Sequence, residues 1–456
     1  MYNRDGPPPD GFWGYLMIRF AVVAPPLQAH YQPLEHLAME LIERGHSVTF
    51  FHQPDARHLI RFPQIKFRSI GADQYPQGSL RITERLASNS NNPFAQRQRI
   101  RDMARSTGIL CEHLPQAFKD ERIDAVICDQ QEAAGALVAQ AMALPFVSIA
   151  CTLPVNREDV TIPLPVLPYP YERDERARRR YLWGAKLHDW LMKPHRTVVR
   201  QQARALGLPD REGLHECLSP LAQISQTVLE FDFPRPNLPP WFHEVGPLRR
   251  LPSVINKLPY TLDTTRPLVF ATLGVLHGRR LGLFKRIARA CKALNAQLLV
   301  MHCGGLNHRQ SDQLLSSGAT WVTDYADQNL VLQYADVLVT HAELNVVLDA
   351  IVAETPILAL PIAADEPGVA ARVAYSGAGI HGSHRASIQT IAEHLRQLLE
   401  NSWPNLEGLA DAVHLMGGTE RAADIVEAVI PDRYKLRLVS IRQPPPSDDG
   451  DKKAGS

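Results

Sequence analysis

Apolar runs and amphipathic stretches alternate along the first third of the chain. "MIRFAVVAPP" (residues 17–26) and "SVTFFHQ" (47–53) are continuous apolar runs typical of buried strands. Between them, residues 31–46 place four aliphatic side chains on one helical face. The same strand, helix and strand pattern recurs over residues 123–130, 132–144 and 145–151. This alternation predicts a parallel, doubly wound α/β sheet.

A different stretch, residues 154–252, separates this half from a second alternating half. It is rich in proline and aromatic residues and holds one basic helix candidate, residues 176–195. The strands predicted after it cover residues 267–274, 296–303, 320–325, 335–340 and 356–361. The helices predicted among and after them cover residues 279–294, 344–354 and 419–430. The middle stretch is therefore expected to supply peripheral helices and a linker.

The two alternating halves predict two Rossmann-like domains that face one another. A chain of 456 residues is too long for one ordinary core and suits two domains. We expect an N-terminal, acceptor-binding domain over residues 17–240 and a C-terminal, donor-binding domain over 241–438. Residues 1–16 and 439–456 are expected to be disordered. Ligands of such sheets bind at the carboxyl ends of the strands, so the expected site is the cleft between the domains.

Charge and composition argue against several classes of function. The 49 basic and 48 acidic residues nearly balance, so nucleic acid is not an expected partner. No apolar run approaches the roughly 18 residues of a membrane-spanning helix, and no signal-peptide pattern opens the chain. We therefore expect a cytoplasmic protein. The six cysteines show no C-x-x-C spacing, which predicts neither a disulfide framework nor a zinc site.

A polar series stands out in the otherwise apolar stretch from residue 339 to residue 379. His341 follows a predicted strand at a predicted helix start, where free backbone amides and the helix dipole favour an anion. Asn345 and Asp349 follow at intervals of four residues, which places all three side chains on one helical face. This order suits a diphosphate followed by a ribose. Taken singly, each residue is more often a helix cap or a solvated side chain.

Two carboxylates, Asp365 and Glu366, follow the next predicted strand, again at a carboxyl end. They suit hydrogen bonds from sugar hydroxyls, so a nucleotide-sugar site is the interpretation that unites all these side chains. A dinucleotide-dependent dehydrogenase fits less well, because no G-x-G-x-x-G follows the first strand of either half.

The stretch from residue 341 to residue 379 resembles the donor-binding motif of the UDP-glycosyltransferase family, whose members have the GT-B fold. Further segments, among them "RFAVVAPPLQAHYQPLEHLAMELIERGHSVTF" and "FHEVGPL", extend the resemblance over roughly residues 17–430. These segments are most similar to the branch of the family that glucosylates the carotenoid zeaxanthin. The resemblance implies the GT-B fold, a UDP-sugar donor and a hydrophobic acceptor.

Residue by residue, the resemblance implies that His341 binds the β-phosphate, Asn345 the α-phosphate and Asp349 the ribose. Asp365 and Glu366 would then face the sugar. Two of these positions depart from the common residues of the family. Asp349 is shorter than the usual glutamate, and Glu366 replaces the usual glutamine.

Three further donor contacts are implied by the same resemblance. Tyr325 takes the place of a tryptophan that stacks on uracil, and Gln328 takes the place of the glutamine in that motif. Gly274 would let the backbone approach the donor. The motif's usual Gly-Gly after the histidine is Ala342-Glu343 here, which brings a carboxylate near the expected phosphate.

Glycosyl transfer to an alcohol also needs a base. His30 follows the first predicted strand, in a loop before a helix expected to begin near Pro33, and Asp129 ends a strand in the same sheet layer. Imidazole has a pKa suited to general base catalysis, and a carboxylate orients it and stabilises the imidazolium. The family uses such a pair, so His30 and Asp129 are the implied catalytic residues. Because His341 and helix amides suit the leaving group, neither a metal ion nor another cofactor is expected.

Taken whole, the sequence predicts an inverting, metal-independent glucosyltransferase that moves glucose from UDP-glucose to the hydroxyls of the carotenoid zeaxanthin. Two alternatives stay open. One is an enzyme of the same fold that acts on another hydrophobic alcohol, such as a macrolide, a sterol or a polyketide. The other is a degenerate nucleotide-sugar binding protein, which the Ala342-Glu343 pair motivates.

The basic helix candidate at residues 176–195 bears on how such an enzyme reaches an acceptor in a bilayer. It combines an arginine cluster with Trp183, Leu187, Trp190 and Leu191 at helical spacing. Basic residues beside an aromatic and aliphatic stripe are typical of an interfacial helix, which predicts peripheral membrane contact. The same stripe is equally typical of a helix packed on its own domain with solvated arginines.

Overall fold

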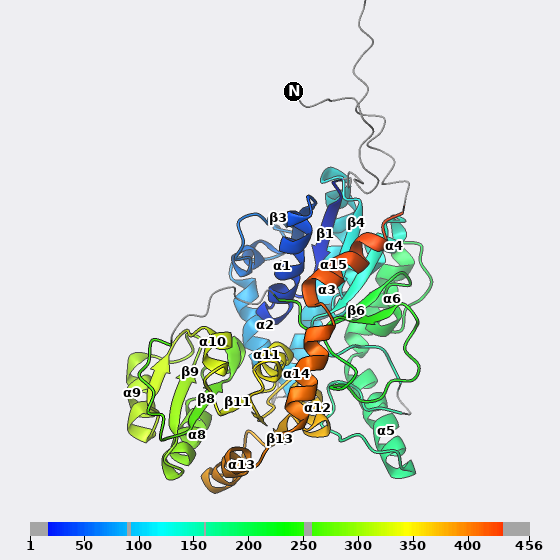
Figure 1. Ribbon diagram of the computed structural model, residues 1–456. Coiled ribbons are helices and arrows are strands. Elements are labelled where there is room, and N and C mark those ends of the chain that lie inside the picture. Colours follow the sequence, from blue (N-terminus) through cyan, green and yellow to red (C-terminus); the bar gives the residue numbers. More distant parts are fainter. Residues whose placement is uncertain (1–16, 89–92, 159–160, 250–257, 432–456) are drawn as a thin grey trace, which may run out of the picture.

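The computed structural model describes residues 17–88, 93–158, 161–249 and 258–431. Within these ranges the chain forms two sheets, one in the N-terminal half and one in the C-terminal half (Figure 1). All strand pairs recorded in both sheets are parallel. The predicted pair of Rossmann-like α/β domains is therefore confirmed.

The N-terminal sheet has seven strands in the order β3-β2-β1-β4-β5-β6-β7. The strands are β1 Arg19–Val23, β2 Ser47–His52, β3 Lys66–Ser69, β4 Ala125–Asp129, β5 Phe146–Ala150, β6 Gln223–Ser225 and β7 Phe242–Glu244. The helices are α1 Gln28–Glu43, α2 Ser79–Ser88, α3 Pro93–Asp120, α4 Ala133–Ala141, α5 Glu175–Leu191 and α6 Lys193–Ala205, with short 3₁₀ segments at Pro54–Leu59 and Leu214–Glu216. The order changes direction between β1 and β4, so their carboxyl ends border the crevice where such sheets bind ligands.

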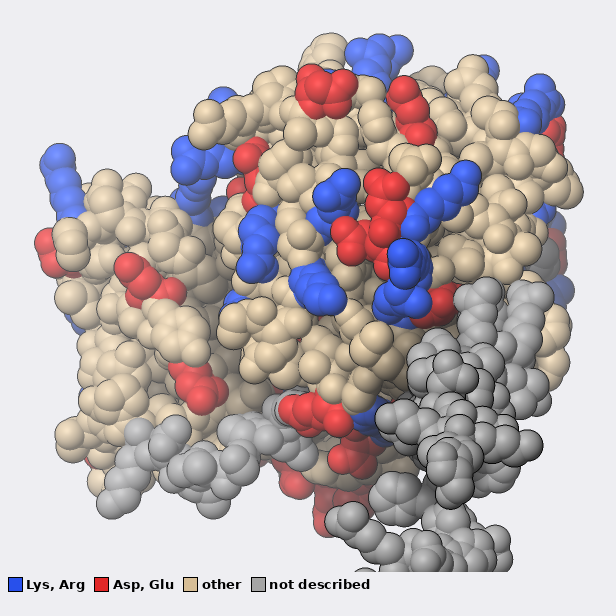
Figure 2. Space-filling view, turned by 90° about the horizontal axis from the view of Figure 1, so that it is seen from above, with Lys and Arg blue, Asp and Glu red and all other residues tan. Residues whose placement is uncertain are grey.

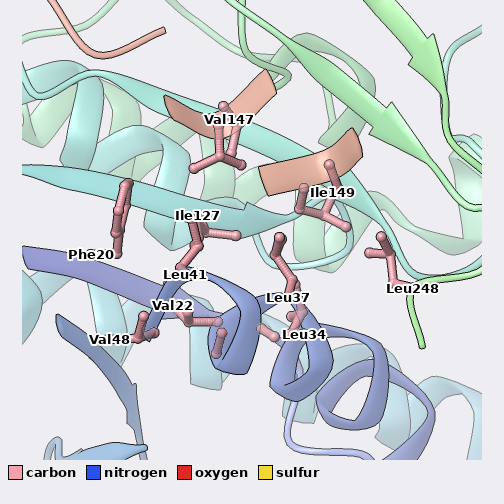
Figure 3. Close-up of a cluster of buried hydrophobic side chains, with 14 of the residues drawn as sticks. Phe20, Val22, Leu34, Leu37, Leu41, Val48, Ile127, Val147, Ile149 and Leu248 are labelled. Atoms are coloured by element: carbon pink, nitrogen blue, oxygen red, sulfur yellow. The ribbon is translucent and has the colours of Figure 1, made fainter. Parts of the chain in front are cut away.

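Alternate residues of the N-terminal strands point to opposite faces of the sheet and bury two separate cores. On one face, Phe20 and Val22 of β1 pack with Leu37 and its neighbours on α1 (Figure 3). On the other face, Ala21 and Val23 pack with residues of α3 and α4. Successive side chains of a strand point to opposite faces, and both faces of β1 are buried. For this reason β1 is a continuous apolar run and not an alternating one.

The C-terminal sheet has six strands in the order β10-β9-β8-β11-β12-β13. The strands are β8 Leu268–Thr272, β9 Gln297–Met301, β10 Trp321–Thr323, β11 Val337–Thr340, β12 Ile357–Ala359 and β13 Gly379–His381. The helices are α7 Gly274–His277, α8 Leu281–Ala293, α9 His308–Ser317, α10 Gln328–Leu332, α11 Leu344–Val352, α12 Glu366–Ser376, α13 Ile388–Glu400, α14 Asn405–Leu415 and α15 Gly418–Ala428. Here the order changes direction between β8 and β11, which defines a second crevice.

The start of α1 differs from the prediction. The helix begins at Gln28, so His30 lies in its first turn and not in a loop before Pro33. Pro33 lies inside α1 and has no N–H to donate to the carbonyl of Ala29, four residues earlier. That carbonyl instead accepts a hydrogen bond from the side chain of Asn345 in the other half, at 3.1 Å. A contact between the halves therefore compensates for the proline.

Two other helices also differ from the prediction in part. α11 begins at Leu344, as the hydrophobic pattern predicts, but His341, expected at the helix start, lies three residues before it, and Glu343 caps the first turn. The single helix expected over residues 176–195 is two helices, since α5 ends at Leu191 and α6 begins with a proline in its first turn. These differences move the ends of elements and leave their order unchanged.

The last helix, α15, returns to the N-terminal half (Figure 1). Ile425 and Val426 belong to the same apolar core as α1. Arg44 Nη1 donates to Glu427 at 2.9 Å, and His46 Nε2 lies 2.8 Å from the other oxygen of that carboxylate. Although α15 lies within the predicted C-terminal domain, its apolar face thus completes the N-terminal core.

Two surface properties bear on possible partners. Within the described ranges, no helix has the length and apolar content that crossing a membrane requires. The face shown in Figure 2 carries Lys and Arg side chains interspersed with Asp and Glu. That face therefore offers a polyanion no uniform positive field.

Candidate active site

His30 and Asp129 meet at the crevice between β1 and β4. His30 Nδ1 lies 2.8 Å from Asp129 Oδ2, and both side chains are buried. The other carboxylate oxygen accepts the backbone N–H of Gln131 at 2.8 Å, which fixes the orientation of the carboxylate. With Nδ1 donating to Asp129, Nε2 is left for a second partner, and His30 lines a cavity. The structure thus brings together the two residues predicted to form a base and its orienting acid.

The surroundings of His30 favour the protonated imidazole. Burial by itself lowers its pKa, but the facing Asp129 and the more distant Asp365 and Glu343 outweigh this effect and raise the pKa above its ordinary value. A proton that this imidazole accepts is therefore stabilised.

Cys151 lies close to the same pair. Ligand atoms of His30, Asp129 and Cys151 all lie within 4.8 Å of one another, a spacing that a metal ion accepts. Burial raises the pKa of the Cys151 thiol well above its ordinary value, and its Sγ donates to the His30 carbonyl at 3.6 Å. In this structure the three residues are therefore joined by hydrogen bonds, from Cys151 to His30 and between His30 and Asp129.

A cavity of about 230 Å³ opens beside His30. Asp365, from the loop after β12, contributes to its wall, so both halves of the chain line it. Its apolar lining includes Met103, Leu164, Val166 and Met192. Arg99 of α3 also lines it, and burial lowers the pKa of this guanidinium although Asp365 opposes that effect. The cavity offers an apolar alcohol a place between a base and a carboxylate of the opposite half.

His341 lies at the carboxyl end of β11, next to Gly274 at the carboxyl end of β8. Its ring is buried, 5.5 Å from the ring of His277, and burial lowers its pKa to about 4. The imidazole is therefore neutral at neutral pH in these surroundings. A Cβ at Gly274 would lie 2.9 Å from His341 Cε1, and the φ of Gly274 is +61°. Only glycine leaves room for this histidine ring.

Glu343 occupies the start of α11 with its own carboxylate. Its oxygens accept the backbone N–H groups of Asn345 at 3.0 Å and Val346 at 3.4 Å, and the Asn345 side chain at 2.7 Å. Such amides are what binds phosphate at a helix start, so this carboxylate stands where the diphosphate is predicted. Burial, together with Asp365, raises the pKa of Glu343 to about 7. Ala342 has φ +67°, which suits the glycine of the family motif.

Asn345 connects the two halves. Its Nδ2 donates to the Ala29 carbonyl at 3.1 Å, and its Oδ1 accepts from Gln226 Nε2 at 3.1 Å. Both partners belong to the N-terminal half. The predicted contact of Asn345 with the α-phosphate stays a prediction. It requires one of the bonds of Nδ2 to be exchanged, either the bond to Ala29 or the 2.7 Å bond to Glu343.

The residues predicted for ribose and base lie near one another. Gln328 Nε2 donates to Asp349 Oδ2 at 2.6 Å, and Arg249 forms an ion pair with the other oxygen of Asp349. Burial lowers the pKa of Arg249 to about 10. Tyr325 is 80% exposed just after β10, so its ring is open to solvent, as stacking on a planar base requires.

Asp365 and Glu366 are adjacent in sequence but differ in their surroundings. Asp365 lines the cavity, and burial together with Glu366 raises its pKa. Glu366 accepts the backbone N–H groups of Ile362 and Ala363 at 2.7 and 2.8 Å, and His277 Nε2 lies 3.0 Å from it. Burial alone would raise the pKa of Glu366, but the bond from His277 and the nearby His341 lower it. Of the two predicted sugar contacts, Asp365 is therefore the one that faces the cavity.

Sequence reasoning missed three residues that shape this site, Arg99, Gln226 and Arg249. Arg249 follows β7 at the edge of the linker, where neither periodicity nor a motif marks it. Gln226 follows β6, a strand of three residues that the hydrophobic pattern did not reveal. Both act on residues more than 90 positions away. No local signal predicts such contacts.

Comparisons with known proteins show the family of this chain. The family model described as UDP-glucoronosyl and UDP-glucosyl transferase matches residues 214–405. A zeaxanthin glucosyltransferase of Pantoea ananas is 46% identical over 418 residues, which cover 91% of this chain and 96% of that protein. One of Pseudescherichia vulneris is 42% identical over 417 residues, covering 91% and 98%.

Solved structures show the same fold. The calicheamicin glycosyltransferase CalG4 has a TM-score of 0.70 at 19% sequence identity, covering 91% of this chain and 98% of that chain. The glycotransferase of kitacinnamycin has a TM-score of 0.71 at 18% identity, covering 91% and 100%. The matches therefore include both halves and the crevices of both sheets. By its identity to the two bacterial relatives, this chain belongs to the UDP-glycosyltransferase family and is an enzyme with the GT-B fold.

Proposed function

We propose that this enzyme transfers glucose from UDP-glucose to the hydroxyl groups of zeaxanthin, with inversion at the anomeric carbon and without a metal ion. The observation that carries the proposal is the His30–Asp129 pair, which borders an apolar cavity that also reaches Asp365 of the donor half. The acceptor follows from the two relatives named zeaxanthin glucosyltransferase, which match nearly the whole chain.

In the proposed reaction, an acceptor hydroxyl enters the cavity and donates a hydrogen bond to His30 Nε2. The hydroxyl oxygen attacks the anomeric carbon of glucose from the face opposite the diphosphate while its proton passes to Nε2. The new carbon–oxygen bond forms as the bond to the diphosphate oxygen breaks, so UDP leaves with the electron pair and the configuration inverts. Asp129 stabilises the imidazolium, because it already accepts the Nδ1 hydrogen at 2.8 Å.

The leaving diphosphate needs donors at the start of α11. His341 and the backbone amides there supply them, and a metal ion has no required role. In the structure, Glu343 accepts hydrogen bonds from these amides and Arg249 pairs with Asp349. UDP-glucose binding therefore has to displace the carboxylate of Glu343 and bring the ribose against Asp349.

The arrangement of Glu343 also supports the second candidate, a protein of the same fold that binds nucleotide sugars without turnover. A carboxylate hydrogen-bonded to the phosphate-binding amides is what a degenerate donor site would show. Turnover of UDP-glucose distinguishes the two, since a binding protein releases no UDP in the presence of an acceptor.

The test uses the purified full chain with UDP-glucose, a chelator and a panel of acceptors. The panel contains zeaxanthin, a macrolide, a sterol and a polyketide, and the readouts are UDP release and the anomeric configuration of the product by NMR. We expect rapid UDP release only with zeaxanthin and a β-linked glucoside. Preference for another alcohol refutes the acceptor assignment, and an α-linked product refutes the inverting mechanism.

A further inference from the structure

The outer face of α5 is apolar and exposed. Trp183 is 65% exposed, Leu187 42% and Trp190 69%. Their spacing of four and three residues places them on one side of the helix. The residues that α5 buries are instead Ala177, Tyr181, Gly184 and Ala185. The tryptophan stripe therefore does not pack on its own domain, which was one of the two alternatives that the sequence left open.

Cations share this face of α5. At roughly 100° per residue, Arg176, Arg179 and Lys186 all fall within about 60° of Trp183 around the helix axis. All three are exposed. Arg179 makes a 3.3 Å ion pair with Glu175, but so exposed a pair contributes little and leaves the charge accessible. Tryptophan and leucine flanked by arginine and lysine are the residues of a helix that lies in a membrane interface.

The inner side of α5 contributes to the acceptor cavity. His188 and Asp189, near the end of this helix, line the cavity that His30 borders, and Met192 at its C-cap lines it too. Trp190 lies between these cavity residues in sequence and points outward. One short helix thus carries an apolar, basic surface on its outside and part of the cavity wall on its inside. In Figure 1, α5 lies at the lower right edge of the molecule, away from α1 and α15.

The size of the cavity favours delivery from a bilayer. Pockets that enclose a drug-sized ligand measure about 300–1,000 Å³. A cavity of about 230 Å³ accepts one end of a long carotenoid and leaves the rest outside. The remaining polyene is strongly apolar, so it needs an apolar environment next to the mouth of the cavity.

We propose that the outer face of α5 docks on an anionic lipid bilayer, and that one end of the acceptor passes from the bilayer into the cavity along this helix. The partner of this face is expected to be an anionic bilayer, because the apolar stripe is flanked by the positive charges of Arg176, Arg179 and Lys186. The proposal of a docking surface depends only on these observations and not on the proposed function. The route for the acceptor rests on the proposed function.

Vesicle flotation of the full chain tests the docking surface. The vesicles contain either phosphatidylcholine alone or phosphatidylcholine with phosphatidylglycerol. We expect binding to the anionic vesicles, weakened by salt, and roughly 100-fold weaker binding when Arg176, Arg179 and Lys186 are all changed to Gln, since each surface cation contributes about fivefold. Trp183→Ser with Trp190→Ser should abolish binding.

Matched controls use exposed residues of the other half. Arg289→Gln, Lys292→Gln and Arg309→Gln remove three exposed cations, and Leu415→Ser with Leu315→Ser removes two exposed apolar side chains. These variants should bind vesicles as the unchanged chain does. Equal binding by the α5 variants and the unchanged chain overturns the proposal. A chain that binds no vesicle but forms a dimer, lost in the tryptophan variant, also overturns it and assigns α5 to contact between copies.

Turnover separates the route of the acceptor from the proposed function. With zeaxanthin in detergent, the α5 variants should match the unchanged chain, because none of the changed side chains lines the cavity. With zeaxanthin in anionic vesicles, their turnover should fall in proportion to vesicle binding. An equal loss in both assays refutes the route. No turnover by any chain in detergent refutes the proposed function and leaves the vesicle result intact.

Discussion

At the scale of single residues, the chemistry of this enzyme depends on which hydrogen bonds are already occupied. His30 has one nitrogen held by Asp129, which leaves the other nitrogen for a substrate. Glu343 is held by two backbone amides and one side-chain amide, so it occupies groups that a diphosphate needs. Under the proposed function, the first arrangement favours catalysis and the second opposes donor binding.

Replacement of the base tests the first arrangement. His30→Ala should lower turnover by about 10²–10⁴-fold, the usual contribution of a general base, while UDP affinity stays the same. Asp129→Asn should lower turnover by the same factor or less, and the double variant should be little worse than His30→Ala, because the pair acts as a unit. Steady-state kinetics with titration calorimetry of UDP measures both. Turnover of His30→Ala close to that of the unchanged chain excludes the mechanism.

Glu343 should make donor binding depend on pH. Burial raises its pKa to about 7, so the carboxylate is protonated below that pH and charged above it. Only the charged form repels the diphosphate, and UDP affinity should therefore fall as pH rises from about 6 to about 8. The control is Glu343→Gln. It keeps the nearby charges of Asp365 and Arg249 and the titration of His30 and of UDP, so it differs from the unchanged chain only in the Glu343 carboxylate. Calorimetry across this range should show a flatter pH dependence for the control.

Glu343→Gly restores the residue that the family motif has at this position. Because it frees the amides of α11 without leaving a charge, UDP should bind more tightly at neutral pH. A glycine cap costs only a few tenths of a kcal/mol of stability, so the thermal unfolding temperature should change little. Markedly weaker UDP binding by this variant would show that Glu343 makes a useful donor contact.

At the scale of elements, the site consists of the ends of parallel strands and the helices that follow them. This part was predictable, because buried parallel strands appear as continuous apolar runs and their carboxyl ends point to one edge. Asp129 and His341 were assigned to such ends, and Asp129 ends β4 while His341 directly follows β11. His30 was assigned to the loop after β1 but lies in the first turn of α1, the helix that follows that strand. The resemblance to the UDP-glycosyltransferase family, which covered both halves, is confirmed by the relatives.

Other parts of the site were not predictable from the sequence. The cap formed by Glu343 depends on a side-chain rotamer and on burial, which a sequence pattern does not specify. The contact between Asn345 and the carbonyl freed by Pro33 joins positions 316 residues apart. Contacts of this kind follow from how the two halves pack against each other, and a hydrophobic period reports only on local structure.

A change at the end of β8 tests how closely the strand ends are packed. In Gly274→Ala, the added Cβ would lie 2.9 Å from the His341 ring and the residue would keep a positive φ. The ring should shift, and UDP affinity and turnover should both fall. Gly282→Ala is the matched control, since its Cβ meets no atom within 4 Å, and in the helix it should stabilise by up to about 1 kcal/mol. Unchanged UDP affinity in Gly274→Ala would show that the His341 position is not critical.

At the scale of the whole molecule, α15 connects the end of the C-terminal half to the core of the N-terminal half. Its residues share a core with α1, the helix that carries His30. Asn345 and Gln226 add a second connection close to the site. The position of His30 relative to the predicted donor residues therefore depends on contacts between the halves.

Loss of an apolar contact in α15 should destabilise the acceptor half. Ile425 is buried in that core, so Ile425→Ala should lower the free energy of unfolding by about 2–5 kcal/mol. Urea denaturation followed by circular dichroism measures the change. Leu415→Ala on α14 is the control, because that side chain is 81% exposed and its removal should have almost no effect. Equal stability of the two variants would show that α15 does not support the core.

The central claim is glucosyl transfer to zeaxanthin by a His30 base, and one measurement tests it most directly. Carotenoid-producing cells expressing the unchanged chain or His30→Ala are extracted, and the carotenoids are analysed by mass spectrometry. The account predicts zeaxanthin carrying one or two hexose units with the unchanged chain, and only traces with the variant at equal protein level. Unmodified zeaxanthin in cells that contain folded, UDP-binding enzyme, or equal glucoside from both chains, would contradict it.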